Sequence, residues 1–370
     1  MSKITDQGDG KMCGICERIQ MIKDGINSVT MFKNFSGVFG VFERTSPLVV
    51  GAADLADKNF SVPNGLDLSY QTASGTKGFT AVAALTLVAQ GKLALDDSVK
   101  TILLKNAATD TAKSYDSLEW LSESVTVRSL LNHTSGVPDY FDEDFIDDFE
   151  GALCGEANYK YDTPERFFPL AEAMWKKQET PYKSAGTFKY SNGGFVLLAA
   201  VIEAVSGMAF HAFMSEHVFS PFGMHKSGCF RLDEQTPAGI VRATSYQKNG
   251  RSNIYGVPVI GGGDGGAYTN PHDMAQFWNK LDPELNAGNS LASLIEEAWK
   301  PSLEGEGNFY GLGFWLRKKN PRIVYLEGFD PGVQFFSYYN RDTKRSLTIC
   351  LNDEAKNCSE VFGNYFSMVE

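Results

Sequence analysis

A serine and a lysine three residues apart, Ser74 and Lys77, form the most promising chemical pair in the sequence. They stand at the beginning of an apolar segment with helical spacing, and residues i and i+3 are neighbours on a helix surface. A lysine can activate a serine hydroxyl only if burial or positive neighbours lower the pKa of the amine. A helix start favours this, because its dipole disfavours the ammonium form and its N–H groups can stabilise an oxyanion. A helix cap followed by a surface lysine has the same spacing, so the pair alone leaves both interpretations open.

Tyr190 and Asn192 place a phenol and an amide just before a second apolar helical segment. Residues two apart in an extended segment point to the same side, so the two groups can converge on one spot. The phenol can accept or relay a proton if a nearby ammonium lowers its pKa, and the amide can bind a substrate carbonyl or hold the lysine. Tyrosine and asparagine two residues apart are common in proteins, so they indicate a catalytic site only in combination with Ser74 and Lys77.

The elements that would position these groups come from both ends of the chain. We predict strands at 35–44, 48–55 and 66–71, then a helix at 75–90 that is apolar nearly all round and ends at Gly91. Further strands are predicted at 309–317, 322–326, 333–339 and 346–351, with a final helix at 357–366. Between them, helical patterns occupy 125–133, 164–177, 194–205, 209–218 and 271–281.

This order predicts an α+β fold, in which an antiparallel sheet flanked by helices carries an all-helical insert domain. The expected divisions are a leader at 1–28, a discontinuous sheet domain at 29–91 and 300–370, and the helical insert at 92–299. A pocket is expected between sheet and insert, where Ser74 would lie. The glycine-rich segment 261–266 is predicted to be a tight backbone passage near the site, and the acidic run 139–150 a solvated face.

The amino-acid composition limits the kinds of partner that the protein is expected to bind. The 370 residues contain 34 Lys and Arg against 45 Asp and Glu, and the net charge of −11 argues against nucleic acid or an anionic membrane as the main partner. No signal-type segment or bilayer-length apolar run is visible, so we expect a cytoplasmic protein without membrane insertion. Six cysteines in a chain of this size favour reduced thiols, and Cys13 and Cys16 are interpreted as an incidental pair, with a redox or metal role as the alternative.

Four segments, in order, resemble motifs of the serine β-lactamase and penicillin-binding-protein superfamily, in the branch of class C β-lactamases, D,D-peptidases and related esterases. They are the Ser74–Lys77 pair with its G-K-L-x-L-D-D-x-V continuation at 91–99, T-x-R-x-L-L-x-H-T-S-G at 126–136, Y-x-N at 190–192, and the glycine-rich segment at 262–278. The resemblance runs from about residue 30 to 352 and implies a β-lactamase-like sandwich of helices around an antiparallel sheet.

The resemblance also implies roles for individual residues. Ser74 would be the acylated nucleophile, Lys77 the base or proton shuttle, and Tyr190 the acid/base that also activates the hydrolytic water. Asn192 would contact the substrate amide or the lysine. His133 sits within the second motif, where a structural role in the turn is expected instead of a catalytic one. No metal or organic cofactor is required by this chemistry.

The third family motif differs in this chain. The family usually carries Lys-Thr-Gly or His-x-Gly shortly before a Pro-Gly, and the corresponding residues here are Leu326-Glu327-Gly328, ahead of Pro331. Gly328 would let a substrate lie along the strand, and the N–H groups of Phe329 and Ser74 would form an oxyanion hole. Leu326 stands where the family has its cation or imidazole, and Glu327 puts a negative charge nearby, which repels a substrate carboxylate. Strand alternation, however, can turn Glu327 to the other face.

These features predict a serine hydrolase that acts through a covalent acyl-enzyme on small esters or amides. The alternatives are a D-amino-acid peptidase or β-lactamase activity, and a non-catalytic relative that retains the pocket for binding. The partner would be a small molecule or a peptide, and the sequence leaves the oligomeric state open. A G-x-S-x-G elbow is absent from the sequence, which argues against an α/β-hydrolase.

Overall fold

The structure is a computed structural model that describes residues 34–107, 118–141, 158–178, 182, 184–301, 303–305 and 307–370. The predicted leader, with Cys13 and Cys16, and most of the predicted acidic run lie outside the described residues. Cys229, Cys350 and Cys358 are free thiols, and Cys154 is not among the described residues.

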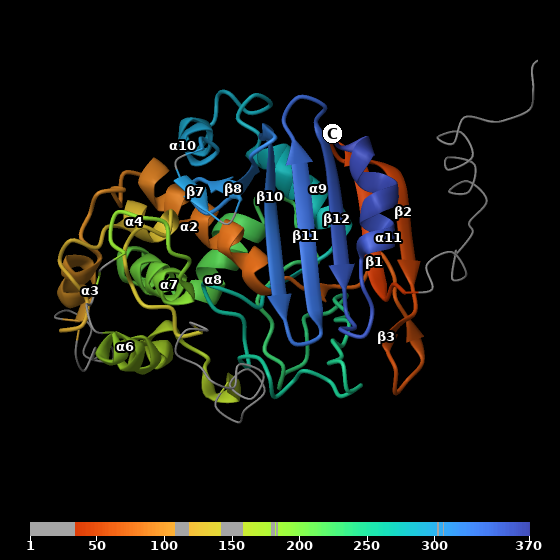
Figure 1. Cartoon of the computed structure of the whole chain (residues 1–370), viewed down its shortest axis with the longest axis horizontal. Helices are drawn as coiled ribbons and strands as arrows, with labels where there is room; N and C mark the ends of the chain where they lie inside the picture. Colours follow the sequence, from red (N-terminus) through yellow and green to blue (C-terminus); the bar gives the residue numbers. More distant parts are fainter. Residues whose placement is uncertain are drawn as a thin grey trace, which may run out of the picture.

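An eight-stranded sheet joins the two ends of the chain, in the order β2-β1-β12-β11-β10-β9-β8-β7 (Figure 1). All its neighbouring strands run antiparallel, and β1 pairs with β12 along its whole length, from Gly37 opposite Leu351 to Glu43 opposite Arg345. The predicted sheet built from both ends is therefore confirmed. Its strands are β1 (Gly37–Glu43), β2 (Ser46–Ala53), β7 (Leu303–Gly305), β8 (Asn308–Tyr310), β9 (Trp315–Arg317), β10 (Asn320–Asp330), β11 (Val333–Asn340) and β12 (Arg345–Leu351).

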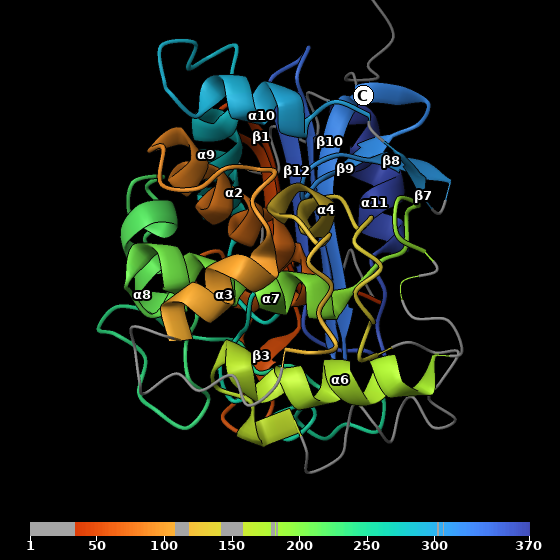
Figure 2. The same cartoon turned by 90° about the vertical axis from the view of Figure 1, so that its left-hand side faces the viewer.

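Helices cover both faces of this sheet, as Figure 2 shows with the sheet nearly edge-on. On one face, α11 (Ser359–Tyr365) packs with the 3-10 turn η5 (Phe366–Met368) over an aromatic cluster that includes Tyr325 and Tyr338. On the other face lie α2 (Thr76–Ala89) and α9 (Pro271–Leu281). Although α9 falls in the predicted helical insert, it packs against β1 and β12.

The central helix α2 matches its prediction closely, because nearly every residue along it is buried, including Lys77. It is capped by Gln90 and followed by Gly91 with φ +68°, a left-handed conformation that glycine adopts without strain. Ser74 does not belong to α2 itself. It lies in the 3-10 turn η1 (Ala73–Gly75), which leads directly into the helix.

Among the remaining helices, α7 packs against α2, α3 and α4, and Figure 2 shows α3, α7 and α8 on the α2 side of the sheet. Two predicted helices are divided: 164–177 into η3 and α6, and 209–218 into α8 and the π-helical turn η4. We did not predict α3 or α10. The elements are α3 (Val99–Ala107), α4 (Val127–Leu131), η2 (Asn158–Lys160), η3 (Pro164–Phe167), α6 (Phe168–Lys177), α7 (Asn192–Ser206), α8 (Phe210–Met214), η4 (Ser215–Phe219) and α10 (Ala292–Ala298).

Two strand predictions needed correction. The predicted strand 309–317 is the hairpin of β8 and β9, because the chain reverses between them where Gly313 has φ +86°. The predicted strand 66–71 is reduced to β5 (Tyr70–Gln71), which pairs with β6 (Tyr268–Thr269). A further small hairpin is formed by β3 (Leu55–Asp57) and β4 (Val62–Pro63).

None of the described helices alone is long and apolar enough to cross a bilayer. One bent pair, Asn192–Ser206 with Phe210–Phe219 at 82°, has the length and composition for it.

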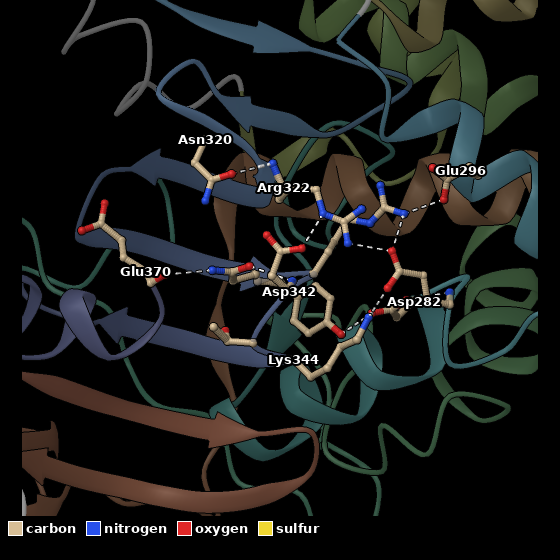
Figure 3. A network of polar contacts seen from close by, with 12 residues as sticks. Asp282, Glu296, Asn320, Arg322, Asp342, Lys344 and Glu370 are labelled. Atoms are coloured by element: carbon tan, nitrogen blue, oxygen red, sulfur yellow. Dashed lines mark hydrogen bonds and ion pairs between the residues drawn. The ribbon is translucent and has the colours of Figure 1, made fainter.

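A polar network ties the beginning of β10 and the β11–β12 turn to the end of α9 and to α10 (Figure 3). Lys344 donates to the buried carboxylate of Asp282 at 2.8 Å and to Glu284 at 2.7 Å. Arg322 bridges Glu284 at 2.7 Å and Asp342 at 2.8 Å. These three ion pairs to Glu284 and Asp282 link the segment that follows α9 to the end of the sheet that lies away from Asp330.

Candidate active site

A cavity of about 830 Å³ opens above η1, between the loop that precedes α7 and the end of β10. Ser74, Tyr190 and Asn192 all line it, although 116 positions separate the first from the second. The structure therefore brings the predicted serine, phenol and amide together in one cavity.

Lys77 lies beneath Ser74 and is only 2 % exposed. Its Nζ donates to Ser74 Oγ at 3.0 Å, to Asn192 Oδ1 at 2.7 Å and to the carbonyl oxygen of Asp264 at 2.6 Å. Three acceptors thus fix the amine within reach of the serine hydroxyl. The surface-lysine interpretation of the Ser74–Lys77 spacing does not apply.

The turn that carries Ser74 is held by backbone contacts from a distant segment. Thr76 Oγ1 donates to the carbonyl of Ala73 at 2.8 Å and accepts from the N–H of Ala267 at 3.0 Å. Ala73 has φ +45°, which is strained for a residue with a Cβ atom and is sustained by these neighbours. Because Gly265 also passes close to Ala73, the tight glycine passage predicted at 261–266 is found beside the serine.

Burial and charge act in opposite directions on Lys77. Desolvation lowers the pKa of its amine to about 8, while Asp264, Asp139 and Asp330 oppose the shift. The neutral amine that a general base requires is therefore accessible near neutral pH.

Tyr190 contacts both members of the pair. Its hydroxyl is hydrogen-bonded to Ser74, and the amine of Lys77 lies 4.8 Å from its ring centroid. The condition that an ammonium lowers the pKa of this phenol is not met: burial raises the pKa well above its usual value, and neighbouring acidic groups add to the rise. Tyr190 is thus a neutral phenol that can relay a proton, and a resting tyrosinate is disfavoured.

His133 supports the Tyr190 loop from behind. Its Nδ1 accepts the N–H of Ser191 at 3.1 Å, and its ring lies 4.4 Å from that of Tyr190, centroid to centroid. Burial and the nearby Lys77 keep the pKa of this imidazole well below its usual value, so the ring is neutral. This geometry agrees with the structural role expected for His133.

Two acidic residues beside Lys77, Asp139 and Asp264, were not predicted as part of the site, and Asp330 on β10 is a third. Asp139 was assigned to a solvated face, but it is buried and accepts both 3.1 Å hydrogen bonds from Asn192 Nδ2. Its burial raises the pKa of the carboxyl to about 6. Asp264 accepts from the hydroxyl of Tyr140 with its side chain while its backbone holds Lys77. Their positions beside the second motif and within the glycine passage were the only available signals.

The residues of the third motif lie on opposite faces of β10, because side chains alternate along a strand. Gly328 packs against the serine turn so closely that a Cβ atom would lie 2.2 Å from the carbonyl oxygen of Thr72 and 2.6 Å from the nitrogen of Ser74. Leu326, two residues earlier, joins the same core as α2, whereas Tyr325 joins the cluster under α11. Neither Glu327 nor Gly328 is among the residues that line the cavity, and Glu327, like Tyr325, lies on the face of β10 away from the serine.

Asp330 is the acidic residue that β10 does bring into the cavity. It has the parity of Gly328, so its side chain lies on the serine side of the strand. Burial and the nearby Asp264 raise the pKa of its carboxyl to about 7. The signal that could have identified it was its place two residues after Gly328.

The described part of the chain contains no group of three or more His, Cys, Asp or Glu side chains arranged to hold a metal ion. Three acidic residues of the cavity, Asp139, Asp264 and Asp330, instead influence the amine of Lys77.

Comparisons with known proteins point in the same direction as the geometry. Residues 31–366 match the family model described as Beta-lactamase. The crystal structure of a penicillin binding protein from Bacillus halodurans superposes with a TM-score of 0.75 at 31% identity, covering 90% of this chain and 97% of that one. Penicillin-binding protein 4* of Bacillus subtilis is 26% identical over 327 residues, covering 82% of this chain and 64% of that protein. A D-aminopeptidase of Brucella anthropi is 29% identical over 199 residues, covering 53% of this chain and 33% of that protein.

Proposed function

Since the chain belongs to the Beta-lactamase family of serine hydrolase folds, we propose that it hydrolyses small esters or amides through a covalent acyl-enzyme on Ser74. One observation carries this proposal: a buried lysine amine, with its pKa lowered to about 8, lies 3.0 Å from the serine Oγ. That is the arrangement an activated nucleophile requires.

Acylation follows from these contacts. Neutral Lys77 takes the proton of Ser74 Oγ while the oxygen attacks the substrate carbonyl. The resulting oxyanion receives hydrogen bonds from the backbone N–H groups of Ser74 and Phe329. The proton then passes from Lys77 through the phenol of Tyr190 to the leaving group, and the carbonyl–leaving-group bond breaks.

Deacylation uses the same groups in reverse. A water molecule replaces the leaving group and gives its proton through Tyr190 to Lys77 as it attacks the acyl carbonyl. The serine–acyl bond breaks, Ser74 Oγ regains a proton, and the acid product leaves. Asn192 holds the amine of Lys77 through its Oδ1 at 2.7 Å and lines the cavity, where we expect it to contact the substrate amide.

The charge of the cavity supports esters or amides without a free carboxylate. Asp139, Asp264, Asp330 and Glu354 are the acidic residues among the described residues that line it, and Lys248 is the basic one. A penicillin or a peptide with a C-terminal carboxylate would be repelled by this wall. The second candidate, a D-amino-acid peptidase or amidase, is favoured by the similarity to a D-aminopeptidase.

Intact mass spectrometry tests the proposal. The protein is exposed to p-nitrophenyl acetate and to a fluorophosphonate, and we expect one covalent adduct and a burst of p-nitrophenolate. Ser74→Ala should abolish both, whereas Ser290→Ala, an exposed serine outside the cavity, should abolish neither. Undiminished labelling of the Ser74→Ala variant, or the absence of any adduct in the parent protein, would overturn the proposal and favour a binding protein.

A further inference from the structure

The carboxylate of Asp330 differs from the other acidic groups next to the serine. The carboxylate of Asp139 accepts hydrogen bonds from Asn192 and from the N–H of Phe141, and that of Asp264 accepts one from the hydroxyl of Tyr140. Within the described residues, no hydrogen-bond donor or ion-pair partner contacts the side chain of Asp330, although neighbouring groups already disfavour its ionisation. A carboxylate placed in this way gains from any cation that enters the cavity.

Asp330 lies within reach of a bound substrate. Gly328 packs against the nitrogen of Ser74, and Asp330 is two residues further along the same face of β10, which corresponds to about 7 Å. A substrate group that is a few bonds from the scissile carbonyl can therefore reach the carboxylate of Asp330 while the carbonyl lies at Ser74. The leaving group must face its proton donors Lys77 and Tyr190, so a group at Asp330 belongs to the acyl portion.

The charges nearby select the kind of group. The amine of Lys77 is hydrogen-bonded to Ser74, Asn192 and the carbonyl of Asp264, and among the described residues it makes no ion pair with the side chain of Asp330. A divalent metal would need further carboxylates, but those of Asp139 and Asp264 are engaged by donors. A primary ammonium needs one carboxylate and brings its own three donors.

We propose that the substrate carries a primary ammonium group on its acyl portion, as in an aminoacyl ester, an aminoacyl amide or a peptide with a free amino end, and that this group ion-pairs with Asp330. This inference rests on the proposed acyl-enzyme function of Ser74. The raised pKa of Asp330, about 7, agrees with a site completed by a cation, because the ammonium would return the carboxyl to its ionised form.

Matched esters test the inference. The p-nitrophenyl esters of glycine and β-alanine are compared with those of N-acetylglycine and N-acetyl-β-alanine, with p-nitrophenyl acetate as the neutral reference and the uncatalysed rate subtracted. We expect kcat/KM to favour the free amines by about 10- to 100-fold, the range of a charge-assisted hydrogen bond. Asp330→Asn, which retains the shape of the side chain, should remove this preference. Because Asp330 also influences the pKa of Lys77, the measured quantity is the ratio of kcat/KM between each free amine and its N-acetyl ester, in which a general change of rate cancels.

Glu327→Gln is the matched control, because it removes the same charge from the same strand on the opposite face. It should leave the preference for the amines intact. Equal rates for free and acetylated amines in the parent protein, or an equal loss with all esters in Asp330→Asn, would overturn the inference. Failure of the proposed function looks different, since no ester at all would then acylate Ser74.

Discussion

Two opposing effects, burial and neighbouring carboxyl groups, set the pKa of the Lys77 amine. Complete burial alone can lower a lysine pKa by several units, which would leave the amine too weak a base to be reprotonated during the reaction. Three neighbouring carboxyl groups, Asp264, Asp139 and Asp330, limit the shift and hold the pKa at about 8. The amine can therefore take a proton from Ser74 and release it again at nearly neutral pH.

This balance predicts the pH dependence of acylation. The active form is the neutral amine, so kcat/KM for p-nitrophenyl acetate should rise about tenfold per pH unit below pH 8 and level off above it. Lys77→Arg should lower acylation at least 100-fold at every pH, because a guanidinium does not deprotonate. A rate that depends on Ser74 but stays flat between pH 6 and 9 would contradict the assignment of Lys77 as the base.

His133 combines two demands that few side chains meet. It has φ +58°, and its Nδ1 accepts the N–H of Ser191 from the loop that carries Tyr190. Asparagine tolerates that backbone conformation and offers a carbonyl oxygen near the position of Nδ1. Leucine satisfies neither requirement and leaves the N–H of Ser191 buried without an acceptor.

We therefore expect His133→Asn to lower the free energy of unfolding by about 1 kcal/mol and His133→Leu by about 3 kcal/mol, measured by urea denaturation. Turnover of p-nitrophenyl acetate should fall further in His133→Leu, because Tyr190 loses its support. If the two variants were equally stable and equally active, the hydrogen bond to Ser191 would not be the reason for a histidine at this position.

At the scale of elements, the site depends on how closely β10 approaches the serine turn. Gly328 leaves no room for a Cβ atom between the strand and the backbone of Thr72 to Gly75. The same approach sets the distance between the N–H groups of Ser74 and Phe329 in the proposed oxyanion hole. A small displacement of β10 would thus affect catalysis directly.

Gly328→Ala is expected to lower kcat/KM for p-nitrophenyl acetate by at least about 100-fold, the cost of losing one oxyanion donor. Gly363→Ala is the matched control, because Gly363 lies in α11 with open space around it, and alanine there should be neutral or slightly stabilising. Stopped-flow release of p-nitrophenolate measures both. Full activity of Gly328→Ala would show that β10 can move away without cost to the chemistry.

At the scale of the whole molecule, one sheet built from both ends of the chain holds the site together. The serine turn follows the N-terminal strands, β10 comes from the C-terminal part, and β12 pairs with β1 to join them. The polar network of Lys344, Asp282, Glu284 and Arg322 stabilises the other end of the same sheet (Figure 3). The polar network that stabilises the sheet and the residues proposed for catalysis therefore lie at opposite ends of β10.

Lys344→Met tests this separation. It leaves the buried carboxylate of Asp282 with the hydroxyl of Tyr339 but without its cation, and we expect a loss of about 3 kcal/mol in the free energy of unfolding. Lys318→Met removes a lysine from an exposed pair with Glu304 and should cost less than about 1 kcal/mol. Both variants should hydrolyse p-nitrophenyl acetate at the parent rate per folded molecule. A selective loss of rate in Lys344→Met would show that the network also shapes the site.

The sequence by itself determined the features that depend on short spacing. Ser74 and Lys77 meet because three residues make nearly one helical turn, and the apolar residues around them predict the burial of α2. The strands that form the centre of the sheet were predicted from their apolar and β-branched residues, and the predicted junction of both chain ends is confirmed.

Only the tertiary structure decided which charges surround the amine. Asp139 and Asp264 reach Lys77 from loops distant in the sequence, and loops carry no periodicity that predicts where their side chains point. Strand register decided the third motif: the pairing of β10 places Gly328 and Asp330 on the serine side and Glu327 on the other face. The negative charge predicted near the substrate was that of Glu327, whereas the residue of β10 that brings a carboxyl into the cavity is Asp330. Only the pleat of the folded sheet decides this, because a shift of one residue exchanges the two faces.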